Sequence, residues 1–195
     1  MIPRNIYDDK ICCRLSRNSL GTKGAALLGK ALETNNTLQF LELEQCELIG
    51  SPYRPDYAGI KALAKGFGSV RSNLRFVNLA DNTLHPEGCR ILLGALSFHP
   101  SLTALNISRN ALSTFNDKQG FLALSYAMRY APLLCWLTID DNPLPPSAWS
   151  VLRVSLAQNA SLTSVSALRC DVTLEQLRDA TASTSHASVL TDLQC

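Results

Sequence analysis

Apolar residues recur along this chain at a fixed spacing that one polar position interrupts. The pattern is L-x-x-L-x-L-x-x-N/C-x-L, with other apolar residues replacing some of the leucines. Seven copies follow one another, the last one truncated, and their first positions are Lys10, Leu38, Leu74, Leu102, Leu134, Leu162 and Leu190. Four of the six intervals between these positions are 28 residues long, so we interpret the chain as an array of repeats.

Each copy predicts a short strand that is followed by a helix. The segments 24–36, 88–100 and 148–160 place apolar residues at helical spacing, and each ends in a polar or proline-containing turn. The repeating unit is therefore strand, loop, helix and turn. Stacked units of this kind predict an α/β solenoid, with a tail over residues 1–9 and one repeat domain over residues 10–195.

The run NSLGTKGAALLGKALETNNTLQFLELEQCEL resembles the ribonuclease-inhibitor-like subfamily of leucine-rich repeats. The resemblance covers residues 10–195, which is nearly the whole chain. It implies a horseshoe of about 6–7 repeats with a concave parallel sheet and convex helices.

The repeat register assigns the core. Positions one, four and six of the pattern point inward, so Leu43, Leu79, Ile107 and Ile139 should form neighbouring rungs of one ladder. The polar position bends the chain off the strand, and its side chain should satisfy buried backbone groups there. The six residues at that position are Asn18, Cys46, Asn82, Asn110, Asn142 and Cys170.

The strand positions between the core residues should face the concave side. Position three then presents three large aromatic side chains, which are Phe40, Phe76 and Trp136. Exposed aromatic rings are enriched in binding hot spots, so we expect them to contact a partner. The alternative is that these rings pack flat on one another or under loops.

Positions five and seven add polar candidates to the same surface. The residues that we expect to contact a partner there are Glu42, Glu44, Asn78, Asn106, Thr138 and Asp140. Glu42, Glu44, Asp140 and Asp141 would form an acidic border. Cationic side chains of opposite sign come from Arg14, Arg109 and Arg169. We therefore expect a surface of mixed charge.

Two connections are longer than the others, at residues 47–59 and 111–120. Both lie between a strand and a helix, so both should emerge on the same rim of the solenoid. Insertions on one face of a solenoid are often binding elements, and the alternative is that they are tolerated surface loops. The candidate contact residues on this rim are Tyr53, Arg54, Tyr57 and Phe115.

Composition and short motifs argue against other chemistry. The net charge is only +2, which does not favour nucleic acid as a partner. The seven cysteines include no C-x-x-C pair, and the three histidines are scattered, so we expect no metal, cofactor or catalytic group. The segment GAALLGKA (24–31) resembles a phosphate-binding loop but should be helical. We expect neither a signal peptide nor membrane contact, and we expect a cytoplasmic protein with reduced thiols.

The sequence therefore predicts a non-enzymatic module that binds another protein through its concave sheet and loop rim. The resemblance leaves three sharper alternatives open: an inhibitor that wraps a nuclease, a Ran-type GTPase-activating protein, and the sensing or autoinhibitory segment of a larger receptor. Because both ends lack polar caps, we also expect either further repeats in a longer chain or end-to-end association.

Overall fold

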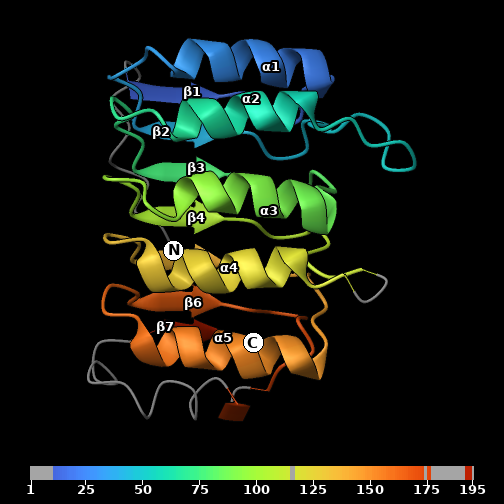
Figure 1. Ribbon diagram of the computed structural model, residues 1–195, viewed down its shortest axis with the longest axis vertical. Coiled ribbons are helices and arrows are strands. Elements are labelled where there is room, and N and C mark those ends of the chain that lie inside the picture. The colour runs from blue at the N-terminus through green and yellow to red at the C-terminus, as the bar shows by residue number, and fades with distance from the viewer. Residues whose placement is uncertain (1–10, 115–116, 174, 177–191, 195) are drawn as a thin grey trace.

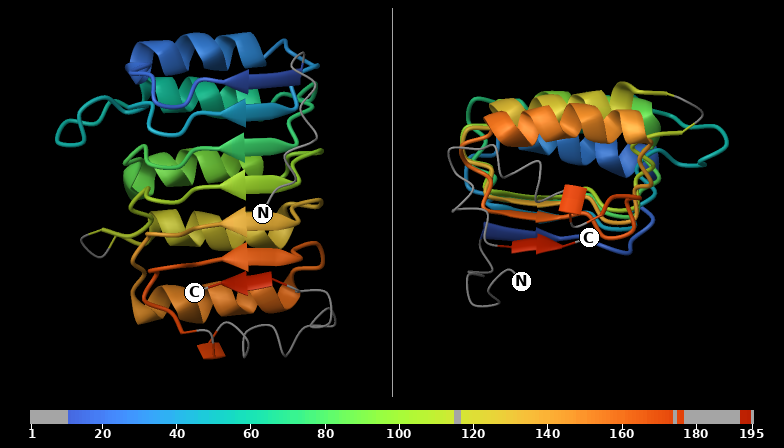
Figure 2. Two further views of the ribbon diagram at one scale, coloured as in Figure 1. Left: turned by 180° about the vertical axis from the view of Figure 1, so that it is seen from behind. Right: turned by 90° about the horizontal axis from the view of Figure 1, so that it is seen from below.

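The computed structural model describes residues 11–114, 117–173, 175–176 and 192–194. Strands and helices alternate along these residues, with the helices in one layer and the strands in another (Figure 1). Viewed along the stack, the helices between Gly21 and Gln158 lie on the same side of the sheet (Figure 2). The fold is therefore the α/β solenoid that the repeat pattern predicts.

Each described strand is only three residues long, and the described strands form one seven-stranded parallel sheet in chain order. The strands are β1 (Cys12–Arg14), β2 (Phe40–Glu42), β3 (Phe76–Asn78), β4 (Ala104–Asn106), β5 (Trp136–Thr138), β6 (Ser164–Ser166) and β7 (Asp192–Gln194). Strand β7 pairs in register with β6, with Leu193 opposite Val165, so the truncated last copy of the pattern contributes a strand. The predicted tail over 1–9, and Lys10, Leu190 and Cys195 of the pattern, lie outside the described residues.

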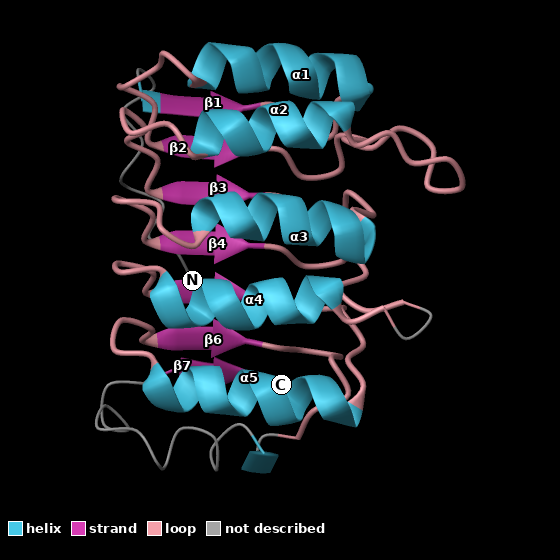
Figure 3. Cartoon of the chain, in the orientation of Figure 1, coloured by secondary structure: helices cyan, strands magenta, loops and turns pink. Residues whose placement is uncertain are grey.

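The helices lie over one face of the sheet (Figure 3). We call this face the convex side and the opposite face the concave surface. The helices are α1 (Gly21–Leu32), α2 (Ala58–Phe67), α3 (His85–Leu96), α4 (Gln119–Tyr130) and α5 (Pro146–Gln158). GAALLGKA (24–31) lies inside α1, which confirms that this segment is helical rather than a phosphate-binding loop.

The helices start and end earlier than the ranges predicted from periodicity. The C-terminal ends are set by side chains in the turns before β2, β4 and β6. The Oδ1 of Asn35 accepts the N–H of Leu38 (2.8 Å), and the Oδ1 of Asn159 accepts the N–H of Leu162 (2.6 Å). His99 has the same place before β4, and its Nδ1 accepts the N–H of Ser101 (3.3 Å). These bonds close a turn and stop the helix.

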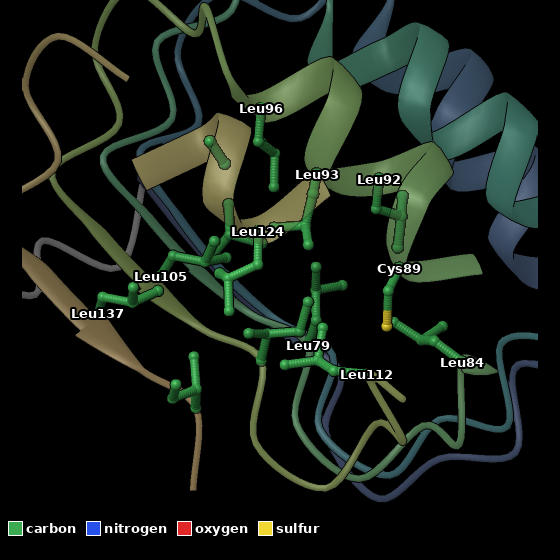
Figure 4. Packing of buried hydrophobic residues seen from close by; sticks show 14 of the residues in the cluster. Leu79, Leu84, Cys89, Leu92, Leu93, Leu96, Leu105, Leu112, Leu124 and Leu137 are labelled. Atoms are coloured by element: carbon green, nitrogen blue, oxygen red, sulfur yellow. The ribbon is translucent and has the colours of Figure 1, made fainter. Parts of the chain in front are cut away.

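The core is a continuous ladder between sheet and helices. Leu43, Leu79 and Ile107 are fully buried and Ile139 is almost fully buried, which confirms the predicted rungs. Leucines of α3 close over the same space, so that Leu79 and Leu92 belong to one packed cluster (Figure 4). Burial of such side chains is the main stabilising term of the fold.

The polar position of the pattern forms a second ladder, as predicted. The Nδ2 of Asn142 donates to the carbonyl oxygen of Ile139 (2.8 Å) in its own repeat and of Ile107 (3.0 Å) in the repeat before. Where cysteine replaces asparagine, the thiol donates instead: the Sγ of Cys170 lies 3.1 Å from the carbonyl oxygen of Ile139. Both residue types therefore satisfy a buried carbonyl group of the preceding strand turn.

Helices α1 and α2 pack against each other through glycine. A Cβ atom added at Gly29 would lie 2.3 Å from the backbone carbon of Ala62, and one added at Gly66 would lie 2.6 Å from the carbonyl oxygen of Gly29. Only glycine allows backbones to approach this closely.

Candidate functional site

The concave surface is built as the pattern predicts, with equivalent positions aligned across the sheet. Register places Phe40 beside Phe76, Phe76 beside Ala104, and Ala104 beside Trp136. The same pairings align Glu42, Asn78, Asn106 and Thr138 in a second line. Each line runs along the solenoid axis, across successive strands.

The prediction that Phe40 and Phe76 are exposed is wrong. Their exposed fractions are 6% and 8%, and they form a small apolar cluster with Ala104, separate from the main core. The ring centroids lie 6.4 Å apart with the planes tilted by 46°. Ile11 and Cys12 pack against this cluster, so the aromatic residues of β2 and β3 stabilise one another instead of offering free ring area.

Trp136 is the aromatic residue of the concave line that does reach solvent. It lies at the start of β5, and 46% of its surface is exposed. Its neighbours across the sheet are the small residues Ala104 and Ser164, which leave the indole uncovered on either side. Tryptophan in such a place combines a large apolar area with a ring N–H group, as binding hot spots often do.

The carboxylates near the N-terminal end of the sheet are already paired. Glu42 lies 3.6 Å from the guanidinium of Arg14, and Glu44 lies 3.8 Å from that of Arg17. Glu44 also accepts a hydrogen bond from the Nδ2 of Asn78 (3.3 Å). These contacts fix the two acidic side chains and confirm that this part of the surface carries mixed charge.

A line of charged residues follows the strands at position eight of the pattern. Five charged residues at this position have a left-handed backbone conformation, with φ between 55° and 62°. They are Arg17, Asp81, Arg109, Asp141 and Arg169. The carboxylate of Asp141 lies between two guanidinium groups, bonded to Arg169 and, at 3.1 Å, to Arg109. Hydrogen bonding to Arg169, with a further contribution from Arg109, lowers the pKa of Asp141 to about 2. Asp141 is therefore ionised throughout the physiological range.

A hollow of about 210 Å³ opens beside these ion pairs at the C-terminal ends of the strands. We call it the concave hollow. Its lining consists of Glu44, Ala80, Asn106, Ser108, Arg109, Thr138, Asp140, Asp141 and Arg169. Five of the predicted contact residues lie in or beside it, because Asn106, Thr138, Asp140 and Glu44 line it and Asn78 is bonded to Glu44.

Two polar side chains of this hollow are held by hydrogen bonds, Asn106 within its own turn and Asp140 to the next repeat. The Oδ1 of Asn106 accepts the N–H (3.1 Å) and the hydroxyl (2.7 Å) of Ser108. The Oδ1 of Asp140 accepts the hydroxyl of Ser166 (2.7 Å) and the N–H of Leu168 (2.8 Å). A partner that enters the hollow therefore meets polar groups that are oriented in advance, which lowers the entropic cost of binding.

The described residues of the two long connections project on the same side of the solenoid (Figure 1). Tyr53 and Arg54 are exposed in the connection to α2, as a rim contact requires. Tyr57 is different, because it packs against the core at the start of α2 and burial raises its pKa. Phe115 lies outside the described residues. The rim prediction therefore applies, within the described part of the chain, to Tyr53 and Arg54.

Arg109 and Arg169, which the sequence placed among the cationic side chains of the concave surface, line the concave hollow, and their recurrence at one repeat position with Asp81 and Asp141 would have indicated the hollow itself. Sequence reasoning missed Phe98, Tyr126 and Tyr130, which are exposed on the convex side. The i, i+4 spacing of the two tyrosines on a predicted helix is the signal for that pair.

Cysteine and histidine side chains do not assemble into a site within the described residues. Cys13 faces the main core and Cys12 the small concave cluster, as the strand alternation predicts. Cys46, Cys89 and Cys170 are buried, and burial raises the pKa of each. In the described part of the chain, no three His, Cys, Asp or Glu residues lie close enough to hold a metal ion.

No described helix is long and apolar enough to span a bilayer.

Comparison with known proteins gives two relatives that are much longer than this chain. NACHT, LRR and PYD domains-containing protein 14 of Mus musculus is 29% identical over 150 residues, which are 76% of this chain and 14% of that protein. Capping protein, Arp2/3 and myosin-I linker protein 2 of Mus musculus is 31% identical over 183 residues, which are 93% of this chain and 13% of that protein. No protein-family model matches the chain. The chain is thus similar to short parts of two large proteins, one of them named for leucine-rich repeats (LRR), and it folds as a leucine-rich-repeat-like solenoid.

Proposed function

We propose that this chain is a non-enzymatic module that binds another protein through the concave hollow and Trp136. The observation that carries the proposal is the presence, on one face of the sheet, of an exposed indole on β5 and of preoriented polar groups on β4 and directly after β5. The indole supplies the apolar anchor. The hollow supplies hydrogen-bond donors and acceptors, and its charged side chains include both cations and anions.

The geometry favours an extended segment of the partner over a flat surface. Neighbouring parallel strands lie about 4.8 Å apart, so a segment that crosses β3 to β6 spans about 15 Å. The exposed residues Tyr53 and Arg54 on the rim would contact the part of the partner that leaves the hollow. Ion pairs such as Arg109–Asp141 would rearrange at small cost, because exposed pairs contribute only about 0–1 kcal/mol.

The relatives suggest which proteins to test first. One of them is named as a linker of capping protein, Arp2/3 and myosin-I, so these three are the first candidate partners. Membership of the ribonuclease-inhibitor-like subfamily is part of the proposal and is supported by a helix of 10–13 residues after each of the first five strands. A cytoplasmic location is also proposed, and the free thiols of the described cysteines fit a reducing compartment.

The experiment measures binding of purified candidate partners to the chain and to two variants by surface plasmon resonance. Trp136→Ser removes the indole, and Thr138→Arg fills the hollow. We expect each to weaken binding about tenfold or more, as loss of a hot spot does. Leu27→Ser is the matched control, because Leu27 is an exposed apolar residue on α1, away from the concave surface.

Two results would contradict the proposal. One is a partner that binds the Trp136→Ser and Thr138→Arg variants as tightly as it binds the original chain. The other is stimulated GTP hydrolysis when the chain is mixed with small GTPases, since that outcome would favour the enzyme alternative.

A further inference from the structure

Three aromatic side chains form a cluster on the convex side of the solenoid, away from the proposed concave site. Phe98 follows α3, and Tyr126 and Tyr130 lie one turn apart on α4. Their exposed fractions are 60%, 46% and 40%. The ring of Phe98 is 5.7 Å from each tyrosine ring, and the two tyrosine rings are 4.4 Å apart, measured between centroids. The rings therefore hold one another in place while each keeps a face or an edge in solvent.

The apolar surface continues beyond the three rings. Leu122 lies one turn before Tyr126 on α4 and is exposed. Val154 is also exposed, and it has on α5 the place that Tyr126 has on α4. We call Phe98, Leu122, Tyr126, Tyr130 and Val154 the convex aromatic patch. Contiguous apolar surface of this kind on a solenoid commonly marks an interaction site.

A hollow borders the patch on the side of α2. It has a volume of about 310 Å³, and Phe98 forms part of its wall. The rest of the lining comes from Phe67, Gly68, Ser69, Val70, Ala95, His99 and Pro100. An apolar side chain of a partner could enter this hollow while a neighbouring side chain stacks on the tyrosine rings.

The charges of the convex helices are strongly unbalanced. Helices α2 to α5 carry five cationic side chains, which are Lys61, Lys65, Arg90, Arg129 and Arg153, and Lys65 is paired with Glu33 at the end of α1 (2.7 Å). They carry one carboxylate, Glu87, and both of its oxygens are bonded to Arg90 at 2.8 Å. Arg129 lies 5.3 Å from the ring centre of Tyr130, at the patch itself. A partner with acidic groups next to its apolar anchors therefore matches this surface.

We propose that the convex aromatic patch is a docking site for an acidic segment of a partner protein that carries aromatic or leucine side chains. One apolar side chain occupies the hollow beside Phe98, and a second stacks on Tyr126 and Tyr130. A carboxylate beside these anchors pairs with Arg129 at the patch, and one further along the segment pairs with Arg153 of α5. A lipid surface would not use the hollow, which is why a protein segment fits the observations better.

The test uses the full chain, immobilised in folded form, and a phage-displayed library of random 16-residue peptides. The most enriched peptide is then synthesised with a fluorescent label, and its affinity is measured by fluorescence anisotropy. We expect enriched peptides to combine aromatic or leucine residues with Asp or Glu. Phe98→Ser with Tyr126→Ser should weaken binding of the labelled peptide about tenfold or more.

A second variant separates charge from apolar contact. Arg129→Glu with Arg153→Glu keeps every residue of the patch, and should weaken binding several-fold and reduce its dependence on salt. If the variant with Phe98→Ser and Tyr126→Ser does not melt cooperatively, it is not properly folded. The charge-reversed variant then tests the proposal by itself. Trp136→Ser is the control from the concave site and should leave the affinity of this peptide unchanged, so the two binding proposals fail or succeed separately.

Four outcomes would overturn the inference. The first is that no peptide is enriched, and the second is that the enriched peptides lack acidic residues. The third is that the charge-reversed variant binds the labelled peptide as tightly as the original chain. The fourth is that the chain binds no peptide but sediments with phosphatidylserine vesicles, and that this sedimentation requires Phe98 and Tyr126.

Discussion

The backbone N–H of Asn82 donates a hydrogen bond to the Oδ1 of Asn110, its equivalent in the next repeat (3.1 Å). The Nδ2 of Asn110 reaches back in turn to the carbonyl oxygen of Leu79 (2.8 Å). The buried asparagines of the ladder therefore each join two repeats, and they are Asn82, Asn110 and Asn142. Consecutive units are connected by polar contacts as well as by apolar packing.

Replacing Asn110 by alanine should destabilise the fold by about 3 kcal/mol, because several buried backbone groups lose their partner at once. Asn110→Cys should cost less, since the thiols of Cys46 and Cys170 fill the same position and donate to a carbonyl. Asn18→Ala is the control and should cost under about 1 kcal/mol, because Asn18 is exposed. Urea unfolding followed by circular dichroism measures all three, and equal losses for Asn110→Ala and Asn18→Ala would disprove the role of the ladder.

The apolar rungs should be at least as sensitive. Leu79→Ala or Ile107→Ala leaves a cavity in a fully buried layer and should reduce the free energy of unfolding by about 2–5 kcal/mol. Leu27→Ala removes the same atoms from an exposed position and should change it by less than about 0.5 kcal/mol. A loss below about 1 kcal/mol for Leu79→Ala would contradict the burial of that rung.

Two glycines in helices should respond oppositely to alanine. Gly29→Ala forces a Cβ atom to within 2.3 Å of the backbone at Ala62, and backbone cannot move as a side chain can. We expect a loss of about 1–3 kcal/mol. Gly94→Ala meets no atom within 4 Å and should stabilise α3 by about 0.5–1 kcal/mol, the difference in helix propensity. Thermal melts compare the two, and a Gly29→Ala protein as stable as the original would show that α1 and α2 are not in tight contact.

His99 should make the stability depend on pH. Burial lowers its pKa to about 4 in the folded chain, below its ordinary value of 6.5. The unfolded chain then binds more protons between these values, so the contribution is fully present above about pH 6.5 and is lost as the pH falls to about 4. The loss from this group should approach about 3 kcal/mol.

His99→Asn is the variant that isolates this effect. Asn35 and Asn159 close the equivalent turns with a side-chain oxygen, so asparagine should preserve the turn without titrating. The difference in unfolding free energy between the original chain and this variant should change steadily from pH 7 to pH 4. A constant difference over that range would rule out His99 as the source.

The repeat pattern predicted the fold well, because one residue type recurs wherever a side chain must be buried or must bond a turn. It assigned Leu43 and Leu79 to the core and aligned Phe40, Phe76 and Trp136 across the sheet. It did not distinguish exposed from covered concave positions. Register places Phe40 and Trp136 in the same line, yet Phe40 is covered by its neighbours and Trp136 is flanked by Ala104 and Ser164. That difference depends on side chains far apart in sequence, which periodicity does not represent.

The helix ends illustrate the same limit. Periodicity extends the first helix to residue 36, whereas Asn35 ends it by accepting backbone N–H groups of Thr37 and Leu38. A local hydrogen bond overrides helical spacing there. The convex patch escaped notice because Phe98 and Tyr126 come from different repeats and meet only when helices stack.

The glycine contact between α1 and α2 also affects the shape of the arc. A solenoid bends because its helical layer is wider per unit than its strand layer, and the bend is greater where helices are held further apart. Glycine lets α1 and α2 lie close together, so the first two units should be nearly straight.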